Sequence, residues 1–578
     1  MLKKMEHYNR LDYLRILSCI MVLLYHLNIL KGGFLAVCTF FVLSGYLECV
    51  SALKKDYFSI KSYYINRFKK IYLPLLIVVF ITIIIFKLHP FTNWMNLKPE
   101  SLSVILGYNN FWQLNANLDY FTKHINSPFM HFWYISILIQ FDLIFPILFS
   151  LLKKIDIAFR KDISIIIVII ATIISTITFI VMSITQEKMI VYYNTFARSF
   201  SFLFGILLAL LHYKYNFKIS RIFRNLHTPI YAIYSILLIA MCLFVSSESN
   251  NYSIYMILST IVSCRIIEYS IEKTIKNNNK LIELISKQTY GIYLIQYPVI
   301  FFLSNNSIIA NILVILITFV LSCILNLLIT KPKIKEIIIC TCIIVTGSIV
   351  LILQKDYSNE MRELEDKLNE NQRISDEQKS RFLNSANTEQ EEKNEKEDQQ
   401  KAETFEEAKI RIAEEVSQLP IVGVGDSVLL GVADSLYEQF PNGYFDGKVS
   451  RTIDGGKEVL QDLINQGKLS NTVVLALANN GDYAEWKNES LMELLGNREV
   501  YWVNAVGADD PEFNSRFKEF AQNYPNIHII EWDVVSQNHP EYFYPDGIHL
   551  NPDGVKPYVN AIYEAIYNNY LEKYKNNN

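Results

Sequence analysis

The sequence predicts two fold classes in one chain: a polytopic all-α membrane domain with about 11 transmembrane helices, followed by an α/β domain with a parallel sheet. Residues 11–353 are dominated by runs of Ile, Leu and Phe, whereas residues 355–578 have the composition of an ordinary polar protein. Over all 578 residues these halves average to a net charge of −3 and a mean hydropathy of +0.19. A single soluble enzyme and a pure channel are both excluded, and without a basic half we expect no nucleic acid as a partner.

Each predicted membrane helix is an apolar stretch of roughly 20 residues, the length that spans a bilayer. The first stretch carries Arg15 and His26 and is followed by many others, so we expect a retained helix and not a cleaved signal peptide. The predicted spans lie near residues 12–30, 34–50, 71–88, 130–152, 163–184, 196–212, 228–247, 252–271, 289–304, 308–330 and 334–353.

The charges of the connecting loops predict the orientation. With the N-terminus in the cytoplasm, the inner segments carry 24 Lys and Arg residues and the outer loops carry five, as the positive-inside rule requires. An odd number of spans then places the C-terminal half outside the cell. The predicted location is therefore the cell membrane, multi-pass, with a cytoplasmic N-terminus, an extracellular C-terminal domain and membrane lipid around the helices.

Composition divides the chain into a membrane domain over 1–354, a charged extracellular linker over 355–418 and an α/β domain over 419–578. The linker is rich in Glu, Lys, Gln and Asn and cannot bury a core, so we expect a solvated spacer, part helix and part coil. All eight cysteines lie in the apolar half. The outer domain therefore has neither a disulfide framework nor a thiolate cluster for zinc, and we expect no metal.

The last part of the chain alternates short β-branched runs with amphipathic helices, which predicts a parallel α/β sheet. In such sheets ligands bind beyond the carboxyl ends of the strands. The predicted strands cover 421–424, 443–449, 472–477, 500–504 and 527–530, and the predicted helices begin near 428, 455, 512 and 553.

Three polar blocks follow this pattern. Ser427 comes just after the first strand, where the N-terminus of a helix favours a developing oxyanion. Asp546 and His549 are three residues apart, a spacing that lets a carboxylate orient an imidazole, and Asn480 follows the third strand. Taken singly, each block also fits an ordinary structure: a helix cap, a surface pair or a plain turn.

Together and in this order, the three blocks resemble the SGNH (GDSL-like) hydrolase family over about 420–575. The resemblance implies a three-layer α/β fold with Ser427 as nucleophile and Asp546 and His549 completing a triad. It also implies an oxyanion hole formed by the backbone of the nucleophile, a glycine in a second block and an asparagine in a third. Asn480 fits the third block, whereas Ser450 stands where the family has glycine.

Ionisable residues inside predicted spans are functional candidates. Arg15 and His26 are eleven residues apart in the first helix, and at about 100° per residue they share one face. The alternative is an interfacial anchor and a buried polar group. A Phe40-Phe41-x-x-Ser44-Gly45-Tyr46 run and an Arg67-Phe68-x-Lys70-Ile71-x-x-Pro74 run follow.

With these motifs, residues 8–330 resemble the membrane-bound acyltransferase-3 family. Two further stretches, 131–136 and 192–198, support the resemblance. It implies that Arg15 and His26 handle an acyl-coenzyme A donor and that Arg67 contacts the phosphates of the donor. Tyr192, Tyr193 and Arg198 are candidates for relaying the acyl group outward.

An acyltransferase-3 unit joined to an outer SGNH domain is similar to the peptidoglycan O-acetyltransferases of Gram-positive bacteria. The resemblance implies that acetyl passes from cytoplasmic acetyl-CoA, a donor substrate and not a bound cofactor, to peptidoglycan glycan strands. The expected acceptor is the C6 hydroxyl of N-acetylmuramic acid, reached through an acetyl-serine on Ser427. The alternatives are O-acetylation of another surface polysaccharide, a multi-span carbohydrate transporter or sensor with a non-catalytic outer domain, and an esterase that removes acetyl groups.

Overall fold

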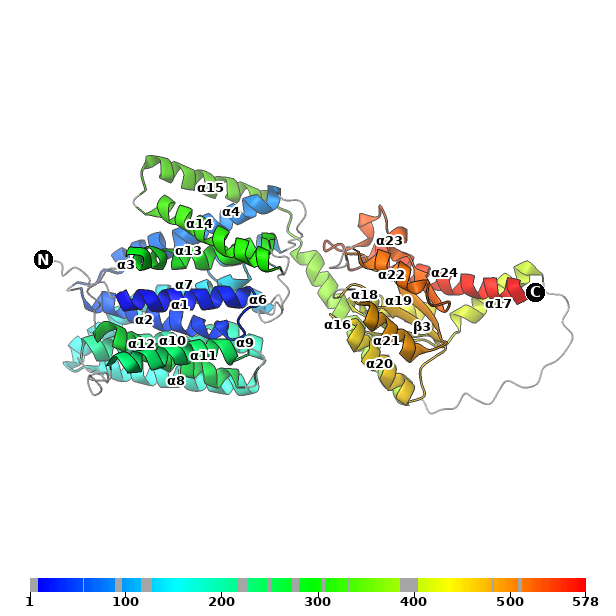
Figure 1. Ribbon diagram of the computed structural model, residues 1–578, viewed down its shortest axis with the longest axis horizontal. Coiled ribbons are helices and arrows are strands. Elements are labelled where there is room, and N and C mark those ends of the chain that lie inside the picture. Colours follow the sequence, from blue (N-terminus) through cyan, green and yellow to red (C-terminus); the bar gives the residue numbers. More distant parts are fainter. Residues whose placement is uncertain are drawn as a thin grey trace. The chain divides into compact units, whose positions relative to one another are not determined.

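The computed structural model divides the chain into two compact units, Met1–Asp356 and Tyr357–Asn578 (Figure 1). The structure describes residues 9–55, 57–88, 96–115, 127–215, 227–246, 249, 251–272, 280–303, 307–330, 332–384, 404–480, 483–507 and 512–577.

The first unit is entirely helical in its described residues. Its elements are α1 (Asn9–His26), η1 (Gly33–Leu35), α2 (Ala36–Leu53), α3 (Ile60–Arg67), η2 (Phe68–Tyr72), α4 (Leu73–Leu88), α5 (Leu97–Ile105), α6 (Asn109–Asn115), η3 (Met130–Phe132), α7 (Trp133–Phe159), α8 (Ile163–Thr185), α9 (Lys188–Tyr193), α10 (Thr195–Tyr213), α11 (His227–Phe244), α12 (Tyr252–Glu272), α13 (Lys280–Leu303), α14 (Ile308–Ile329) and α15 (Ile334–Leu353).

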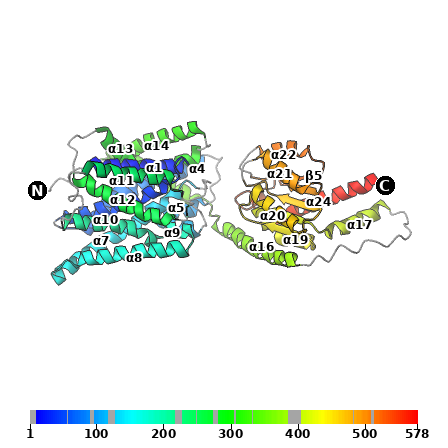
Figure 2. The same ribbon diagram turned by 60° about the horizontal axis from the view of Figure 1, so that its bottom comes forward.

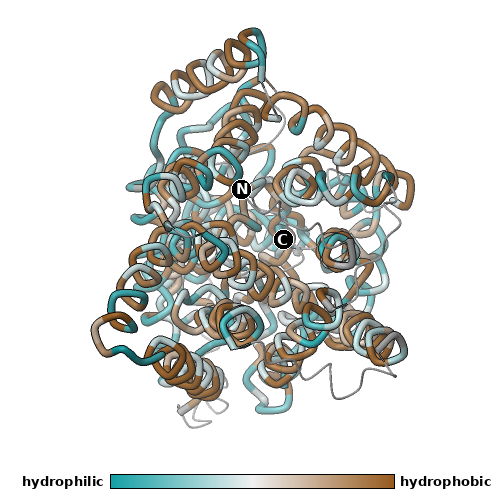
Figure 3. The backbone as a smooth tube through the Cα atoms, turned by 90° about the vertical axis from the view of Figure 1, so that its left-hand side faces the viewer, coloured by the Kyte–Doolittle hydropathy of each residue, from teal (hydrophilic) through white to brown (hydrophobic). Residues whose placement is uncertain are grey.

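Among the described residues, eight helices are long and apolar enough to cross a membrane. The other three predicted spans correspond to the helices α1, α11 and α13, which do not meet that criterion, so the structure supports eight of the eleven. Figure 3 shows apolar residues on most turns of the helices of this unit. Residues 216–224 and 273–279 of the inner segments on which the predicted orientation rests lie outside the described residues, and the orientation stays a prediction.

The core of the helical unit is centred on α2, which packs closely against α10. Gly45 of α2 and Gly205 of α10 face the partner backbone: a Cβ at Gly45 would overlap the Phe202 carbonyl, and one at Gly205 would overlap the Val42 carbonyl. Small residues let membrane helices approach in this way.

The backbone before α4 is a π-helix, η2. Pro74 has no N–H to bond the carbonyl four residues earlier, which interrupts the α-helical ladder at this point.

The second unit is built around a five-stranded sheet in the order β2-β1-β3-β4-β5 with every neighbouring pair parallel. This confirms the α/β fold class, and the predicted strands match within two residues. Nearly every strand residue before β5 is buried, as in parallel sheets covered on both faces. The elements are β1 (Val422–Gly425), α18 (Ser427–Gly431), α19 (Ala433–Gln439), β2 (Tyr444–Gly447), α20 (Ile453–Asn465), β3 (Thr472–Ala476), α21 (Glu485–Leu495), β4 (Glu499–Val503), α22 (Phe513–Ala521), β5 (Ile527–Ile530), α23 (Trp532–Val535), η6 (Pro540–Tyr542) and α24 (Pro552–Asn577).

Two further helices lie in the segment 355–418, for which the composition predicts a solvated spacer. α16 (Ser358–Asn384) contacts α18, α19 and β2, and α17 (Phe405–Ser417) contacts α24; Figure 2 shows α16 alongside α19. The spacer interpretation is therefore wrong for these two helices. A few well-placed side chains suffice to dock α16, since Leu364, Asn371 and Ser375 are each at most 4% exposed although the helix is polar on average.

Candidate functional site

Ser427 lies at the junction of β1 and α18. Strand β1 is flanked by the edge strand β2 and the central strand β3. The preceding Asp426 caps α18: its carboxylate accepts a hydrogen bond from the N–H of Val428 at 2.8 Å. The N–H of Asp426 donates to the Ala476 carbonyl of β3 at 2.8 Å. These two bonds fix the turn on both sides, so that Ser427 is the first residue of the helix and is 8% exposed.

The loop before α24 brings His549 to Ser427. The Nε2 atom of His549 is 2.8 Å from the Oγ atom of Ser427, and its Nδ1 atom is 2.7 Å from Oδ2 of Asp546. The other carboxylate oxygen of Asp546 accepts the N–H groups of Ile548 and His549, each at 2.9 Å. The turn that makes this possible requires Gly547 at φ +70°, a conformation that favours glycine. The three predicted triad residues thus form one hydrogen-bonded chain.

The two carboxyl groups near Ser427 have opposite pKa shifts. Burial opposes ionisation of Asp546, but the hydrogen bond and charge of His549, together with two backbone N–H groups, outweigh it and lower the pKa of Asp546. Asp426 is more deeply buried. Burial raises its pKa from 3.8 to about 6, despite its hydrogen bonds to Val428 and Asn479. Asp546 is therefore the carboxylate suited to stabilise a charged imidazole.

Ser450 and Asn480, the expected oxyanion-hole residues, lie next to each other in the structure. Nδ2 of Asn480 donates to the carbonyl of Arg451 at 3.3 Å, directly beside Ser450. Ser450 has φ +59°. Ser450 therefore adopts the left-handed backbone conformation, which favours glycine.

This arrangement can support nucleophilic catalysis. The imidazole is within hydrogen-bond reach of the hydroxyl whose proton it would take, and the carboxylate holds the other ring nitrogen. Ser427 also occupies the N-terminus of a helix, where backbone N–H groups favour negative charge. The chemistry that fits is acyl transfer through a serine ester.

The helical unit contains a cavity of about 550 Å³ among α1, α2, α3, η2, α7 and α13. Its lining includes the two arginines that the sequence singled out, Arg15 and Arg67, together with Lys55 and Lys70. Arg15 is paired with Asp12 at 3.1 Å. The carboxylate of Glu48 also lines the cavity, so four cationic side chains and one anionic side chain lie beside an apolar wall. The excess of positive charge suits a ligand that has phosphates at one end and a flexible chain at the other.

Arg67 is also engaged inside the protein. Its guanidinium contacts Asp142, with Nη2 and Nε at 2.6 and 2.9 Å from Oδ1, and it forms a second ion pair with Glu48. The hydroxyl of Tyr63 donates to Glu48 at 2.7 Å. Neither Glu48 nor Asp142 is among the functional residues predicted from the sequence. Both are carboxylates within predicted spans, and the rule that selected Arg15 and His26 would also have found them.

His26 does not occur among the described residues that line this cavity. Its ring lies edge-on to Tyr297 with centroids 5.0 Å apart and is 6.1 Å from the ring of His131. Tyr293 connects the two places, because it lines the cavity and its ring centroid is 5.2 Å from that of His131. His131 and Tyr297 are neighbours of His26 that sequence analysis missed, although His131 belongs to a stretch noted for family resemblance.

Tyr192, Tyr193 and Arg198 lie together in the buried core of the helical unit. The guanidinium of Arg198 lies 4.9 Å from the ring centroid of Tyr192 and 5.5 Å from that of Trp133. The ring centroids of Tyr192 and Tyr193 are 6.2 Å apart.

Comparison with known proteins gives matches to both units. The sequence profile of the acyltransferase-3 family, described as an acyltransferase domain, matches residues 8–331. The O-acetyltransferase OatA of Staphylococcus aureus strain NCTC 8325 is 27% identical to the chain over 600 residues, which cover 96% of this chain and 95% of that protein. OatA of S. aureus strain COL matches to the same extent, with 27% identity over 600 residues.

Among solved structures, the C-terminal catalytic domain of Streptococcus pneumoniae peptidoglycan O-acetyltransferase A, with a methylsulfonyl adduct, matches with a TM-score of 0.24 and 23% identity. The match covers 26% of this chain and 93% of that chain. A GDSL-like lipase from Bacteroides thetaiotaomicron matches with a TM-score of 0.22 and 17% identity, covering 28% of this chain and 97% of that chain.

Proposed function

This chain belongs to the acyltransferase-3 family, and on that premise we propose that it is an O-acetyltransferase which moves acetyl from cytoplasmic acetyl-CoA to a glycan outside the cell. The observation that carries the proposal is the hydrogen-bonded chain Ser427–His549–Asp546 in a protein whose other unit is an acyltransferase. Similarity to an O-acetyltransferase along nearly the full length supports it.

In the outer step, Ser427 accepts the acetyl group and passes it on. Nε2 of His549 takes the proton of the Ser427 hydroxyl while Oγ attacks the acetyl carbon, and the leaving group departs with that proton. The hydroxyl of the acceptor then loses its proton to His549 and attacks the acetyl-serine. The ester forms on the acceptor, and Oγ of Ser427 regains a proton. The N–H groups of Ser427 and Ser450 and the amide of Asn480 would stabilise the oxyanion in both steps.

On the donor side, the cavity with Arg15 and Arg67 would hold acetyl-CoA. The phosphates would lie near the cationic groups, and the acetyl end would reach His26 past Tyr293 and His131. His26 would act as a general base or orient the thioester. Tyr192, Tyr193 and Arg198 are the relay that we propose for the outward transfer. By resemblance to the Gram-positive enzymes, the acceptor would be the C6 hydroxyl of N-acetylmuramic acid.

The test is the acetate that mild base releases from purified cell walls of a strain lacking the gene, complemented with wild type, Ser427→Ala or His26→Ala. We expect wild type to restore wall O-acetate and both variants to fail. Restoration by Ser427→Ala would refute the acetyl-serine. A rise of wall acetate on deletion would identify an esterase instead, and acetate missing only from another surface polysaccharide would reassign the acceptor.

A further inference from the structure

The left-handed backbone of Ser450 needs support from its surroundings. Residues with a Cβ disfavour this conformation, and a turn with a single unfavourable residue relaxes unless its neighbours hold it. An oxyanion donor is effective only when its N–H is fixed before the charge develops. The groups that fix the loop over 448–451 therefore also fix the position of the Ser450 N–H.

Arg451 is the group that holds this loop. Its guanidinium donates to the Gly425 carbonyl at 3.0 Å, contacts the Asp446 carbonyl, and forms an ion pair with the Asp446 carboxylate at 2.5 Å. Its backbone N–H closes the turn on the carbonyl of Lys448 at 3.2 Å, and the N–H of Lys448 donates to the same Gly425 carbonyl at 3.2 Å. Both ends of the loop are thus attached to the strand that leads into Ser427.

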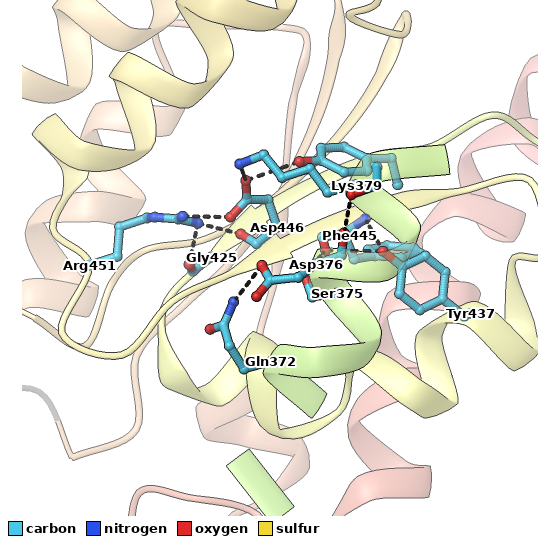
Figure 4. A network of polar contacts seen from close by, with 11 residues as sticks. Gln372, Ser375, Asp376, Lys379, Gly425, Tyr437, Phe445, Asp446 and Arg451 are labelled. Carbon is cyan, nitrogen blue, oxygen red and sulfur yellow. Dashed lines mark hydrogen bonds and ion pairs between the residues drawn. The ribbon is translucent and has the colours of Figure 1, made fainter. Parts of the chain in front are cut away.

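Asp446 extends this network to α16. In Figure 4 its carboxylate lies between Arg451 and Lys379 of α16, with the Lys379 ammonium at 3.1 Å. The hydroxyl of Tyr444 also donates to it at 3.0 Å. Burial opposes ionisation of Asp446, but the charges and hydrogen bonds of Arg451 and Lys379 outweigh it and lower its pKa. The bridging group is therefore a carboxylate at neutral pH.

α16 is firmly attached to this side of the α/β unit. Asn371 donates to the Leu430 carbonyl of α18 at 2.9 Å, and Ser375 donates to the Phe445 carbonyl of β2 at 3.0 Å. The rings of Phe382 and Tyr444 are stacked with centroids 4.5 Å apart. The helix that follows the last candidate span, with only residues 354–357 between them, is therefore integral to the α/β unit.

We propose that Arg451 and Asp446 are positioning residues for the oxyanion site and that α16 takes part through Lys379. The chain of contacts runs from Lys379 through Asp446 and Arg451 to the loop that presents the Ser450 N–H. The inference rests on the proposed function, because it assumes that the Ser450 N–H donates a hydrogen bond to the oxyanion. It adds residues that touch neither the substrate nor the triad.

The first test compares wild type, Arg451→Lys, Ser450→Gly and the double variant as full-length protein in detergent micelles, with p-nitrophenyl acetate as acetyl donor. Lysine keeps the charge but cannot span Asp446 and the Gly425 carbonyl together. We expect Arg451→Lys to lower kcat by about 10- to 100-fold, with KM within about twofold and an unshifted pH profile. Because glycine adopts the left-handed backbone without support, adding Ser450→Gly should restore kcat by about fivefold or more.

The second test isolates the contribution of α16. Lys379→Met keeps most of the alkyl stem and removes the charge that faces Asp446. Arg373→Met is the matched control, since Arg373 is on the same helix, is 72% exposed and pairs only with Glu370 and Glu377 among the described residues. We expect Lys379→Met to lower kcat about two- to fivefold and the control to leave it unchanged.

Wild-type kcat in Arg451→Lys, or a loss that Ser450→Gly does not relieve, would overturn the positioning role and leave Arg451 a purely structural residue. Equal losses in Lys379→Met and Arg373→Met would remove α16 from the proposal. A wild-type chain that neither releases p-nitrophenol nor reacts at Ser427 with a fluorophosphonate would instead overturn the proposed function, and this inference with it.

Discussion

The two units of the chain differ in where their charged side chains lie and in what surrounds them. In the helical unit, Arg67 forms ion pairs with two buried carboxylates, Glu48 and Asp142, among apolar helices. In the α/β unit, the triad gathers at the carboxyl edge of the sheet. A buried ion pair within the helices is first a requirement of folding, because an unpaired charge there is costly. A polar cluster at a sheet edge has no such requirement, and its geometry is the better guide to chemistry.

The largest effect that separates the two units should come from Asp546→Asn. An amide cannot stabilise the imidazolium and favours the wrong tautomer of His549, so we expect kcat for p-nitrophenyl acetate to fall by about 10⁴-fold. Thermal unfolding of the purified full chain should change little, because Asn retains the acceptor for the N–H groups of Ile548 and His549.

The control for this prediction is Asp553→Asn, an exposed aspartate in the first turn of α24. It should keep wild-type kcat. A loss of less than about tenfold in Asp546→Asn would mean that His549 does not depend on Asp546 for its orientation, and the triad interpretation would fail.

In the helical unit, Arg67→Met should affect folding first. It leaves Glu48 and Asp142 buried together without their cation, and we expect the free energy of unfolding to fall by about 3–5 kcal/mol. Arg160→Met, which changes an exposed arginine at the end of α7, is the matched control and should have little effect. The measurement is the unfolding of the full chain in detergent, followed by circular dichroism.

A further variant makes this prediction sharper. Adding Glu48→Gln and Asp142→Asn to Arg67→Met removes the uncompensated charges and should recover much of the lost stability. If Arg67→Met unfolds like wild type while KM for acetyl-CoA rises, Arg67 serves mainly the donor, as the sequence resemblance implied.

The α/β site was predictable because each of its blocks is local. Ser427 follows a strand, and Asp546 and His549 are three residues apart, so the sequence alone indicates each motif. The sheet alternation also places the first motif at the carboxyl edge. The left-handed φ of Ser450 was not predictable, since it depends on Arg451 reaching across to another strand.

The pairings in the helical unit could not be predicted, for a different physical reason. Arg67 meets Asp142, and His26 meets His131, through helices that lie far apart in the sequence. Hydropathy predicts where such helices lie but not which faces meet. The docking of α16 was missed for a related reason: its mean polarity indicated a solvated segment, while a few positions such as Asn371 and Ser375 decide the contact.

The smallest of these effects concerns Asp426, which is a buried carboxyl without an ion pair in the part of the chain that the structure describes, in contrast to Glu48 and Asp142. Because burial raises its pKa from 3.8 to about 6, the native state binds a proton that the unfolded state has lost between those pH values. Stability should therefore fall as pH rises from about 4 to about 6 and then level off, by about 3 kcal/mol. Asp546 and Asp446 have lowered pKa values, so their contributions change only below about pH 4.

Asp426→Asn isolates the pH-dependent contribution of Asp426 to stability, because Asn retains the cap on the Val428 N–H and does not titrate. The measurement is amide hydrogen exchange of β1 and β3 in the full chain, which reports the opening free energy of the α/β unit alone. The difference between variant and wild type should grow in favour of the variant from pH 4 to pH 6 and be constant above. A difference that does not vary with pH would mean that Asp426 is ionised throughout this pH range. Interactions in the α/β unit would then offset the cost of burying its carboxylates, as the ion pairs of Arg67 do in the helical unit.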